Sequence, residues 1–178
     1  MANIVGRVIW ITGLSGSGKT SLAYEVMNLL GQKKKYPAIH LDGDELRKVF
    51  IGNKTEAQNY SRESRLTLSM QYARLCKLIS SSGTTVVIST ISMFKEVYSW
   101  NRKNLPGYFE VYLDVPKGEL ARRDPKNIYK EFNEGIRKNV AGLDLAVDEP
   151  QFPDWSPKFD NNKSVAVLAE ELISILEN

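Results

Sequence analysis

The sequence is poor in the two residue types that build most thiol, imidazole and metal chemistry: its 178 residues include one cysteine and one histidine. Cys76 falls inside a helical pattern of apolar residues, which favours a buried structural thiol, and no base is paired with it that would make it a nucleophile. Any Ser-His-Asp, Cys-His or histidine-based metal site would have to use His40, which lies between two aliphatic residues of a predicted strand. These site classes are therefore disfavoured, and a chain of this length can bury a full core without disulfides.

Long apolar runs and a strong charge of one sign are also missing. No stretch approaches the length that spans a membrane, and the first ten residues lack the charged start and apolar run of a signal peptide. The formal net charge of +3, from 24 basic and 21 acidic residues, is too mild to indicate a nucleic-acid-binding protein. We therefore expect a cytoplasmic protein that acts without a membrane or a nucleic acid as its partner.

Short apolar or β-branched runs alternate with helical patterns along the chain. The runs predict buried strands at 8–11, 38–41, 84–89 and 109–113. The spacing of apolar residues predicts helices at 20–30, 62–82, 95–104 and 164–176. This alternation is typical of a three-layer α/β/α fold with a parallel sheet, in which ligands bind at the carboxyl ends of the strands. We expect one domain over residues 1–178, with a charge-rich excursion at about 117–140 acting as a lid.

A glycine-rich segment follows the first predicted strand and directly precedes a helix. It reads Gly13-Leu14-Ser15-Gly16-Ser17-Gly18-Lys19-Thr20 and satisfies the P-loop pattern G-x-x-x-x-G-K-[ST]. Glycines let backbone N–H groups wrap closely around phosphates, and the helix adds its positive N-terminal end. Lys19 would supply a charge to the β- and γ-phosphates, and the Thr20 hydroxyl would reach Mg²⁺. The sequence therefore predicts a P-loop NTPase fold that binds ATP and magnesium through Gly13, Ser15, Gly16, Ser17, Gly18, Lys19, Thr20 and Ser21.

Two carboxylates, Asp42 and Asp44, follow the second predicted strand, with Arg47 one helical step further on. A carboxylate at this edge of the sheet could orient or deprotonate a substrate hydroxyl, and Arg47 could bind an anionic acceptor through two hydrogen bonds. Alternatively, Asp44 is a helix N-cap and Arg47 a solvated charge. The spacing alone does not separate the two interpretations.

Together with the P-loop, Leu41-Asp42-Gly43-Asp44-x-x-Arg47 resembles the adenylylsulfate kinases, which phosphorylate the 3′-hydroxyl of adenosine 5′-phosphosulfate. Ile91-Ser92 is similar to the family's serine segment, and Leu113-Asp114-Val115-Pro116 to its Asp-Ala-Pro strand end. The run from Arg123 to Lys130 resembles its lid signature, and Lys138-x-x-x-Gly142-Leu143-Asp144 resembles its Lys-Gly-Phe-Thr-Gly-Ile-Asp segment. The resemblance extends in order and spacing from Val8 to Pro150.

The resemblance implies roles for individual residues. Asp44 would orient or activate the acceptor hydroxyl, and Lys126 would close over the transferring phosphoryl group from the lid. Ser92 is counted with these catalytic candidates because the family's serine can hold a phosphate, although we favour a role in lining the pocket. Arg123 of the lid signature joins the ATP-binding residues. The implied acceptor-binding set is Asp42, Asp44, Arg47, Arg62, Ile91, Ser92, Lys126 and Val140. The family also commonly forms homodimers.

Three departures from the family pattern all fall on the acceptor side. Val140 stands where the family has an aromatic residue that stacks on the adenine of the acceptor, and Lys95 stands where it has an arginine. The family's asparagine and arginine pair after the equivalent of Arg62 is replaced by Arg65, Thr67 and Leu68. The acceptor is therefore expected to be adenosine 5′-phosphosulfate or a close analogue, and the alternative is a cytidine diphosphate-type nucleotide used in polysaccharide modification.

Two other classes of protein share the P-loop. A general small-metabolite kinase would not explain the lid signature together with Gly142-Leu143-Asp144. A non-catalytic ATP-binding module is the third possibility, and loss of Lys19, Asp44 or the lid lysines would favour it. All of these residues are present.

Overall fold

A computed structural model describes residues 6–33, 37–52 and 61–177 of the chain. Its sheet has the strand order β2-β3-β1-β4, and all neighbouring strands pair in parallel. The strands are β1 (Val8–Thr12), β2 (Ala38–Asp42), β3 (Thr85–Ser89) and β4 (Tyr108–Tyr112). Each overlaps a strand predicted from the sequence, with shifts of one residue at some ends.

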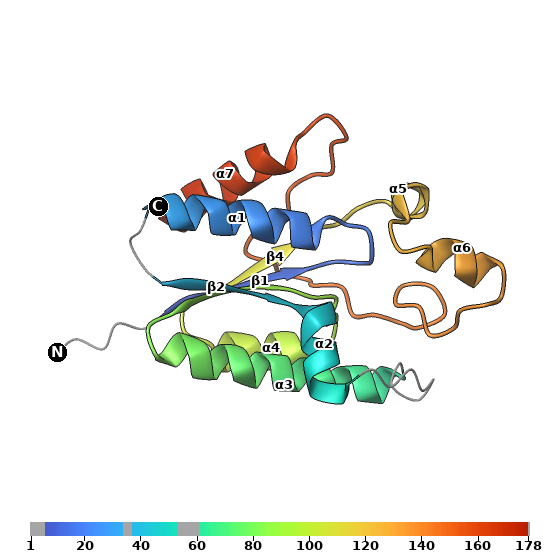
Figure 1. Cartoon of the computed structure of the whole chain (residues 1–178), viewed down its shortest axis with the longest axis horizontal. Helices are drawn as coiled ribbons and strands as arrows, with labels where there is room; N and C mark the ends of the chain where they lie inside the picture. The colour runs from blue at the N-terminus through green and yellow to red at the C-terminus, as the bar shows by residue number, and fades with distance from the viewer. Residues whose placement is uncertain (1–5, 34–36, 53–60, 178) are drawn as a thin grey trace.

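Helices cover both faces of this sheet (Figure 1). On one face lie α1 (Lys19–Lys33) and α7 (Val165–Glu177), and on the other α3 (Arg62–Ser81) and α4 (Lys95–Asn104). Because successive residues of a strand point to opposite faces, Ile9 and Ile11 pack beneath α1 and α7, whereas Val8 and Trp10 pack against α3 and α4. The predicted three-layer α/β/α architecture is confirmed.

Three short helices lie at the carboxyl ends of the strands. Helix α2 (Gly43–Ile51) follows β2 without a break, and α5 (Lys117–Arg123) and α6 (Ile128–Asn133) follow β4. Figure 1 shows α5 and α6 beyond the end of the sheet, beside the loop that joins β1 to α1. A small apolar cluster joins them to the body of the protein, and it consists of Leu14, Met93, Tyr112, Leu120, Tyr129 and Ala141. The charge-rich excursion predicted from the sequence is therefore a pair of helices with their own apolar anchor.

The segment before α7 runs along the outer edge of β4. The backbone N–H of Trp155 donates to the carbonyl oxygen of Glu110 at 3.0 Å, and the backbone carbonyl of Trp155 accepts from the N–H of Tyr112 at 2.9 Å. These bonds occupy backbone groups that an edge strand would otherwise expose. None of the helices in the described part of the chain is long and apolar enough to cross a membrane.

Candidate active site

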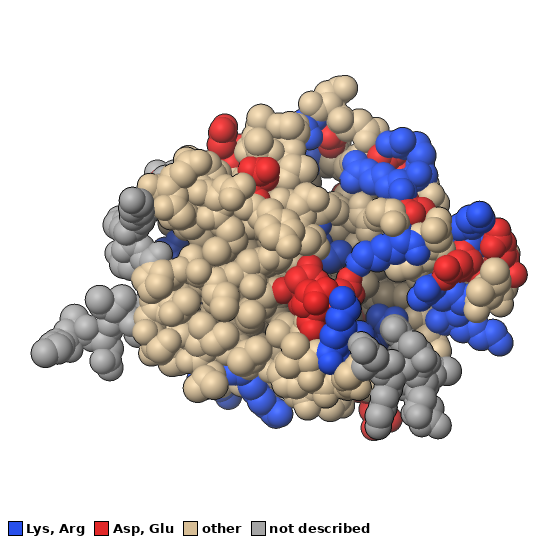
Figure 2. All heavy atoms as spheres, viewed as in Figure 1, with Lys and Arg blue, Asp and Glu red and all other residues tan. Residues whose placement is uncertain are grey.

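One large cleft, of about 1090 Å³, opens at the carboxyl ends of the strands. Its wall includes most of the residues that the sequence singled out: Ser15, Gly16, Gly18, Lys19, Thr20, Ser21, Asp42, Asp44, Arg47, Ile91, Ser92, Arg123, Lys126 and Val140. Figure 2 shows Lys and Arg side chains gathered on the side of the molecule where α5 and α6 lie. Gly13, Ser17 and Arg62 do not line the cleft: Gly13 and Ser17 are buried, and Arg62 forms ion pairs with Asp148 and Glu96.

The P-loop has the backbone conformation that its glycines permit. Gly13, Gly16 and Gly18 have φ angles of 146°, 80° and 93°, in the region that side chains disfavour. A Cβ atom on Gly13 would also lie 2.7 Å from the carbonyl oxygen of Leu113. The glycines of the motif are therefore required by the turn itself, independently of any ligand.

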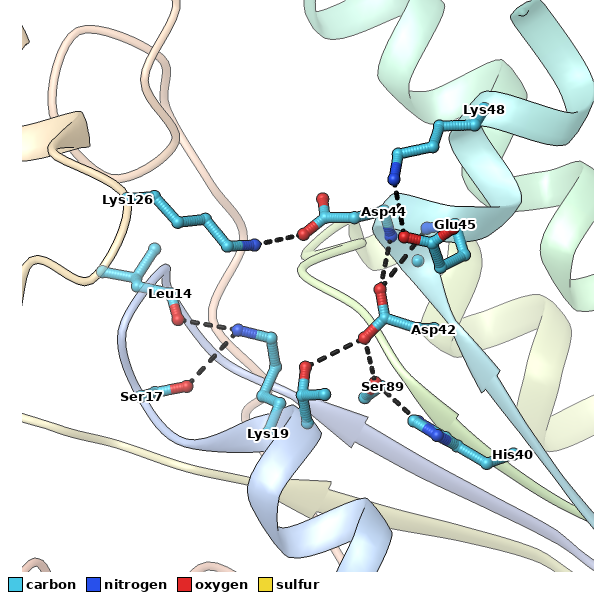
Figure 3. A network of polar contacts seen from close by, with 12 residues as sticks. Leu14, Ser17, Lys19, His40, Asp42, Asp44, Glu45, Lys48, Ser89 and Lys126 are labelled. Atoms are coloured by element: carbon cyan, nitrogen blue, oxygen red, sulfur yellow. Dashed lines mark hydrogen bonds and ion pairs between the residues drawn. The ribbon is translucent and has the colours of Figure 1, made fainter.

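Lys19 turns back over the loop that precedes it. Its Nζ atom donates to the carbonyl oxygen of Leu14 at 2.8 Å and lies 3.4 Å from the Ser17 hydroxyl (Figure 3). Burial lowers the pKa of the Lys19 ammonium to about 8, although the charge of Asp44 opposes this shift. A bound phosphate would stabilise the ammonium and raise that pKa again, so the site favours an anionic ligand.

The two carboxylates after β2 have different surroundings. Asp42 is the N-cap of α2, where its Oδ1 accepts the N–H groups of Asp44 and Glu45 at 2.9 and 3.4 Å. Its Oδ2 accepts the Thr20 hydroxyl at 2.9 Å. The possible N-cap role of Asp44 is thus wrong, because Asp42 occupies that position, and Asp42 faces the P-loop threonine.

Asp44 instead points across the cleft. Its carboxylate forms an ion pair with Lys126, from the segment between α5 and α6 (Figure 3). Both side chains are more than half exposed, at 63% and 57%. The pair joins residues 82 positions apart in the sequence, and it brings the predicted acid–base residue and the predicted lid lysine together.

Arg123 lies between the cleft and a smaller hollow beside the P-loop. The hollow, of about 90 Å³, is lined on the other side by the segment 157–165, which includes Phe159 and Lys163. The guanidinium of Arg123 lies 5.4 Å from the centroid of the Phe159 ring and bonds to Glu119 at 2.7 Å. The sequence does not predict this wall, because the segment 157–165 contains no motif, and only the return of the chain beside the P-loop reveals it.

Ile91 and Ser92 line the cleft beyond the end of β3. Ser92 is buried, has a φ of 31° and shares a hydrogen bond of 2.8 Å with the Thr90 hydroxyl. Arg62 lies 5.3 Å from the centroid of the Phe94 ring and donates to Asp148 at 3.0 Å. In this structure the guanidinium of Arg62 is therefore paired with carboxylates of the protein itself, since Glu96 also lies 3.8 Å away.

A tight turn places Val140 in the wall of the cleft. The Asp144 carboxylate accepts the N–H groups of Asn139 and Val140 at 2.8 and 2.6 Å, and Gly142 packs against Leu14 of the P-loop. From α3, Arg65 donates to the carbonyl oxygen of Asn139 at 2.9 Å. Three further residues line the cleft, and no motif in the sequence points to them: Arg137, Asn139 and, from α3, Tyr72.

The sequence matches known proteins along most of its length. The family model described as adenylylsulphate kinase matches residues 5–157. A cytidine diphosphoramidate kinase of Campylobacter jejuni is 40% identical over 145 residues, which are 81% of this chain and 81% of that protein. An adenylyl-sulfate kinase of Pseudomonas aeruginosa is 34% identical over 149 residues, which are 83% of this chain and 74% of that protein.

Solved structures agree with the sequence matches. The adenylylsulfate kinase of Mycobacterium tuberculosis, determined in complex with AMPPNP and APS, superimposes with a TM-score of 0.86 and 30% identity, and the match covers 98% of this chain and 99% of that one. The sheet and covering helices thus match those of a kinase whose structure was determined with an ATP analogue bound. The chain belongs to the adenylylsulfate kinase family, whose members are ATP-dependent kinases of small nucleotides.

Proposed function

We propose that this protein transfers the γ-phosphoryl group of magnesium ATP to the ribose 3′-hydroxyl of a small nucleotide with an anionic 5′ group. The observation that carries the proposal is the Asp44–Lys126 pair, which lies in the same cleft as the P-loop lysine. A carboxylate that can accept a hydroxyl proton, and two ammonium groups that can neutralise phosphoryl charge, thus share one cavity. A non-catalytic ATP-binding module would have no need for this arrangement.

The transfer can be derived from these residues. The acceptor hydroxyl would take the place of the Lys126 ammonium beside Asp44, and Asp44 would accept the hydroxyl proton as the oxygen attacks the γ-phosphorus. The bond from that phosphorus to the β–γ bridging oxygen breaks, and ADP leaves with the electron pair. Lys19 would hold the β- and γ-phosphates, and Lys126 would follow the transferring group. We infer that the segment at about 117–140 acts as the lid that excludes water.

The donor set at Thr20 fits magnesium. Mg²⁺ in kinase sites is held by one or two protein oxygens together with phosphates and waters, rather than by a cage of protein ligands. Within residues 6–33, 37–52 and 61–177, no three His, Cys, Asp or Glu side chains are grouped as a metal cage. When bound, the metal would neutralise charge on the β- and γ-phosphates.

The adenine of ATP is assigned to the hollow beside Arg123. That hollow adjoins Ser17 and Gly18 of the P-loop and has a planar cation on one side and the Phe159 ring nearby. A purine ring is flat and polarisable, so it can stack against the Arg123 guanidinium. Entry of the ring would require Arg123 and Phe159 to separate.

For the acceptor, we propose a cytidine diphosphate-type nucleotide ahead of adenosine 5′-phosphosulfate. The wall of the cleft offers aliphatic Val140 in place of an aromatic ring, and Arg65 bridges α3 to Asn139 beside it. A guanidinium can donate to the O2 and N3 acceptors of cytosine, whereas the loss of stacking weakens binding of adenine. The Campylobacter jejuni relative, at 40% identity, carries the name of a kinase with such an acceptor.

The experiment is a panel of acceptors incubated with the protein and magnesium ATP, and followed by phosphorus NMR. The panel varies the base between cytosine and adenine and the 5′ group between diphosphate, diphosphoramidate and phosphosulfate. We expect a phosphate to appear on the 3′-hydroxyl of the cytosine compounds at a rate above that for the adenine compounds. Turnover of adenosine 5′-phosphosulfate above all cytosine compounds would reverse the order of the two acceptors, and ATP consumption without any phosphorylated acceptor would contradict the kinase itself.

A further inference from the structure

A chain of polar side chains leads from the edge of the sheet to Thr20. His40 and Asp42 are two residues apart on β2, so the alternation of the strand points both toward the same face. The register of the parallel pair places Ser89 of β3 opposite Asp42 and Val87 opposite His40. Val87 packs in the core beneath α1, and therefore this is the face that α1 covers.

The donor and the acceptor can be assigned for each hydrogen bond in this series of side chains. Asp42 Oδ2 accepts from the Ser89 hydroxyl at 3.0 Å and from the Thr20 hydroxyl at 2.9 Å. Each hydroxyl has a single proton, and the carboxylate can only accept. The Ser89 oxygen must then accept from His40 Nε2, which lies 2.9 Å away (Figure 3). His40 accordingly carries a proton on Nε2.

The Asp42 carboxylate is held from both sides. Its Oδ1 accepts backbone N–H groups at the start of α2, and its Oδ2 accepts the two hydroxyls. The four bonds use its four lone-pair positions, so the carboxylate cannot rotate without breaking one of them. Because the Thr20 proton is directed to Asp42, the lone pairs of the Thr20 oxygen are left for the cleft.

We propose that Ser89 and His40 are positioning residues for the magnesium site. They fix the Asp42 carboxylate in the orientation that takes the Thr20 proton and leaves the Thr20 oxygen available to the metal. Partners of this kind orient metal ligands in many proteins, and their loss typically costs about 10- to 100-fold in metal affinity. The inference rests on the proposed function, because it requires magnesium ATP to be the donor.

The hydrogen bonds from His40 to Thr20 also explain why a lone histidine lies in a strand beneath α1. Its ring is half-buried and meets the Tyr24 ring of α1 edge-on, with the centroids 5.1 Å apart. Burial lowers the pKa of His40, which favours the neutral ring with one donor nitrogen. A leucine at this position could fill much of the same space but could not donate to Ser89.

The test measures nucleotide binding rather than turnover. A fluorescent ATP analogue is titrated with the protein in EDTA and over a series of Mg²⁺ concentrations, for the parent, Ser89→Ala, His40→Leu and the double variant. The quantity compared is the Mg²⁺ concentration that gives half of the maximal enhancement of nucleotide binding. We expect it to rise about tenfold in Ser89→Ala and about threefold in His40→Leu, with nucleotide binding in EDTA unchanged. The double variant should match Ser89→Ala, because His40 acts through Ser89.

Ser80→Ala is the matched control. Ser80 is also a buried serine, and its hydroxyl bonds to the carbonyl oxygen of Lys77 within α3, at the opposite end of the sheet from the cleft. It should leave the magnesium dependence as in the parent. His40→Gln keeps a side-chain N–H donor. It should therefore retain most of the magnesium affinity that His40→Leu loses.

Three results would overturn the inference. They are a magnesium dependence within twofold of the parent in Ser89→Ala, equal losses of binding in EDTA and in magnesium, and additive effects in the double variant. A parent protein that binds no nucleotide under either condition would instead contradict the proposed function. The two failures are therefore distinguishable.

Discussion

The two ends proposed for the cleft, one for ATP and one for the acceptor, are built in different ways. The ATP end consists largely of one continuous segment, residues 13–20. Its glycine conformations allow backbone N–H groups to form the phosphate site. The acceptor end is assembled from α2, α3, the segment after β3 and the turn at 139–144, and side chains form its surface. Single side-chain replacements can therefore change the acceptor while the phosphate site stays as it is.

The substitutions that separate this chain from the family pattern follow that division. Val140 and Arg65 line the cleft and Lys95 directly follows Phe94, which also lines it, whereas the P-loop satisfies its motif at every position. The Asp44–Lys126 pair lies in the same cleft, and we propose that it serves the phosphoryl transfer itself.

Removing the P-loop ammonium should have the largest effect. Lys19→Ala is expected to lower kcat/KM for ATP on the order of 10³-fold, because a fixed charge at the transferring phosphates is lost. The measurement is coupled ADP release at saturating acceptor. Lys77→Ala, which removes an ammonium stacked on Trp100 outside the cleft, should leave the rate within twofold. A Lys19→Ala protein as active as the parent would break the assignment of the ATP end.

Neutralising Asp44 should affect turnover but not ATP binding. Asp44→Asn is expected to lower kcat by about 10²-fold, since the hydroxyl loses its proton acceptor, while the Kd for ATP stays within about twofold. Single-turnover transfer and equilibrium binding separate the two quantities. Glu45→Gln changes the neighbouring exposed carboxylate, which pairs with Lys48, and should have little effect on either. Equal losses in the two variants would mean that the effect is general electrostatics.

Restoring the family's residues at the acceptor end should shift its preference. The double variant Arg65→Asn, Val140→Phe is expected to raise the ratio of kcat/KM for adenosine 5′-phosphosulfate over the cytidine acceptor about tenfold, through gained stacking on adenine. Leu143→Phe adds the same ring at a partly exposed position of the same turn and is the control. An unchanged ratio would show that the base is read elsewhere.

The smallest effect expected is a pH dependence of ATP binding. Burial lowers the pKa of Lys19 to about 8 in the empty site, and bound phosphate raises it, so affinity is highest below pH 8 and falls as the pH rises through it. Between pH 7.0 and 8.5 the Kd should increase about fourfold, with uptake of a proton on binding. Calorimetry in buffers of different ionisation enthalpy measures that proton. In Lys19→Arg the side chain stays charged, and the dependence should disappear.

The sequence was most informative where structure depends on neighbours along the chain. The apolar runs of the strands, the spacing of apolar residues in the helices and the P-loop motif are local features. The strands and helices predicted from them lie within a few residues of those observed. It was least informative for Asp42, which the motif groups with the acceptor residues. The structure shows this carboxylate capping α2 and accepting from Thr20 and Ser89, while the acceptor assignments, that of Asp42 included, remain predictions.

The order of residues alone determined that a phosphate loop follows the first strand, because a contiguous run of backbone and glycine conformations makes that site. Only the tertiary structure decided that Lys126 meets Asp44, that Arg65 reaches Asn139, and that His40 bonds to Ser89. These contacts depend on the register of the parallel strands and on where the segment after β4 packs against the rest of the protein. Both are fixed by packing between segments far apart in the chain, and no local pattern encodes them.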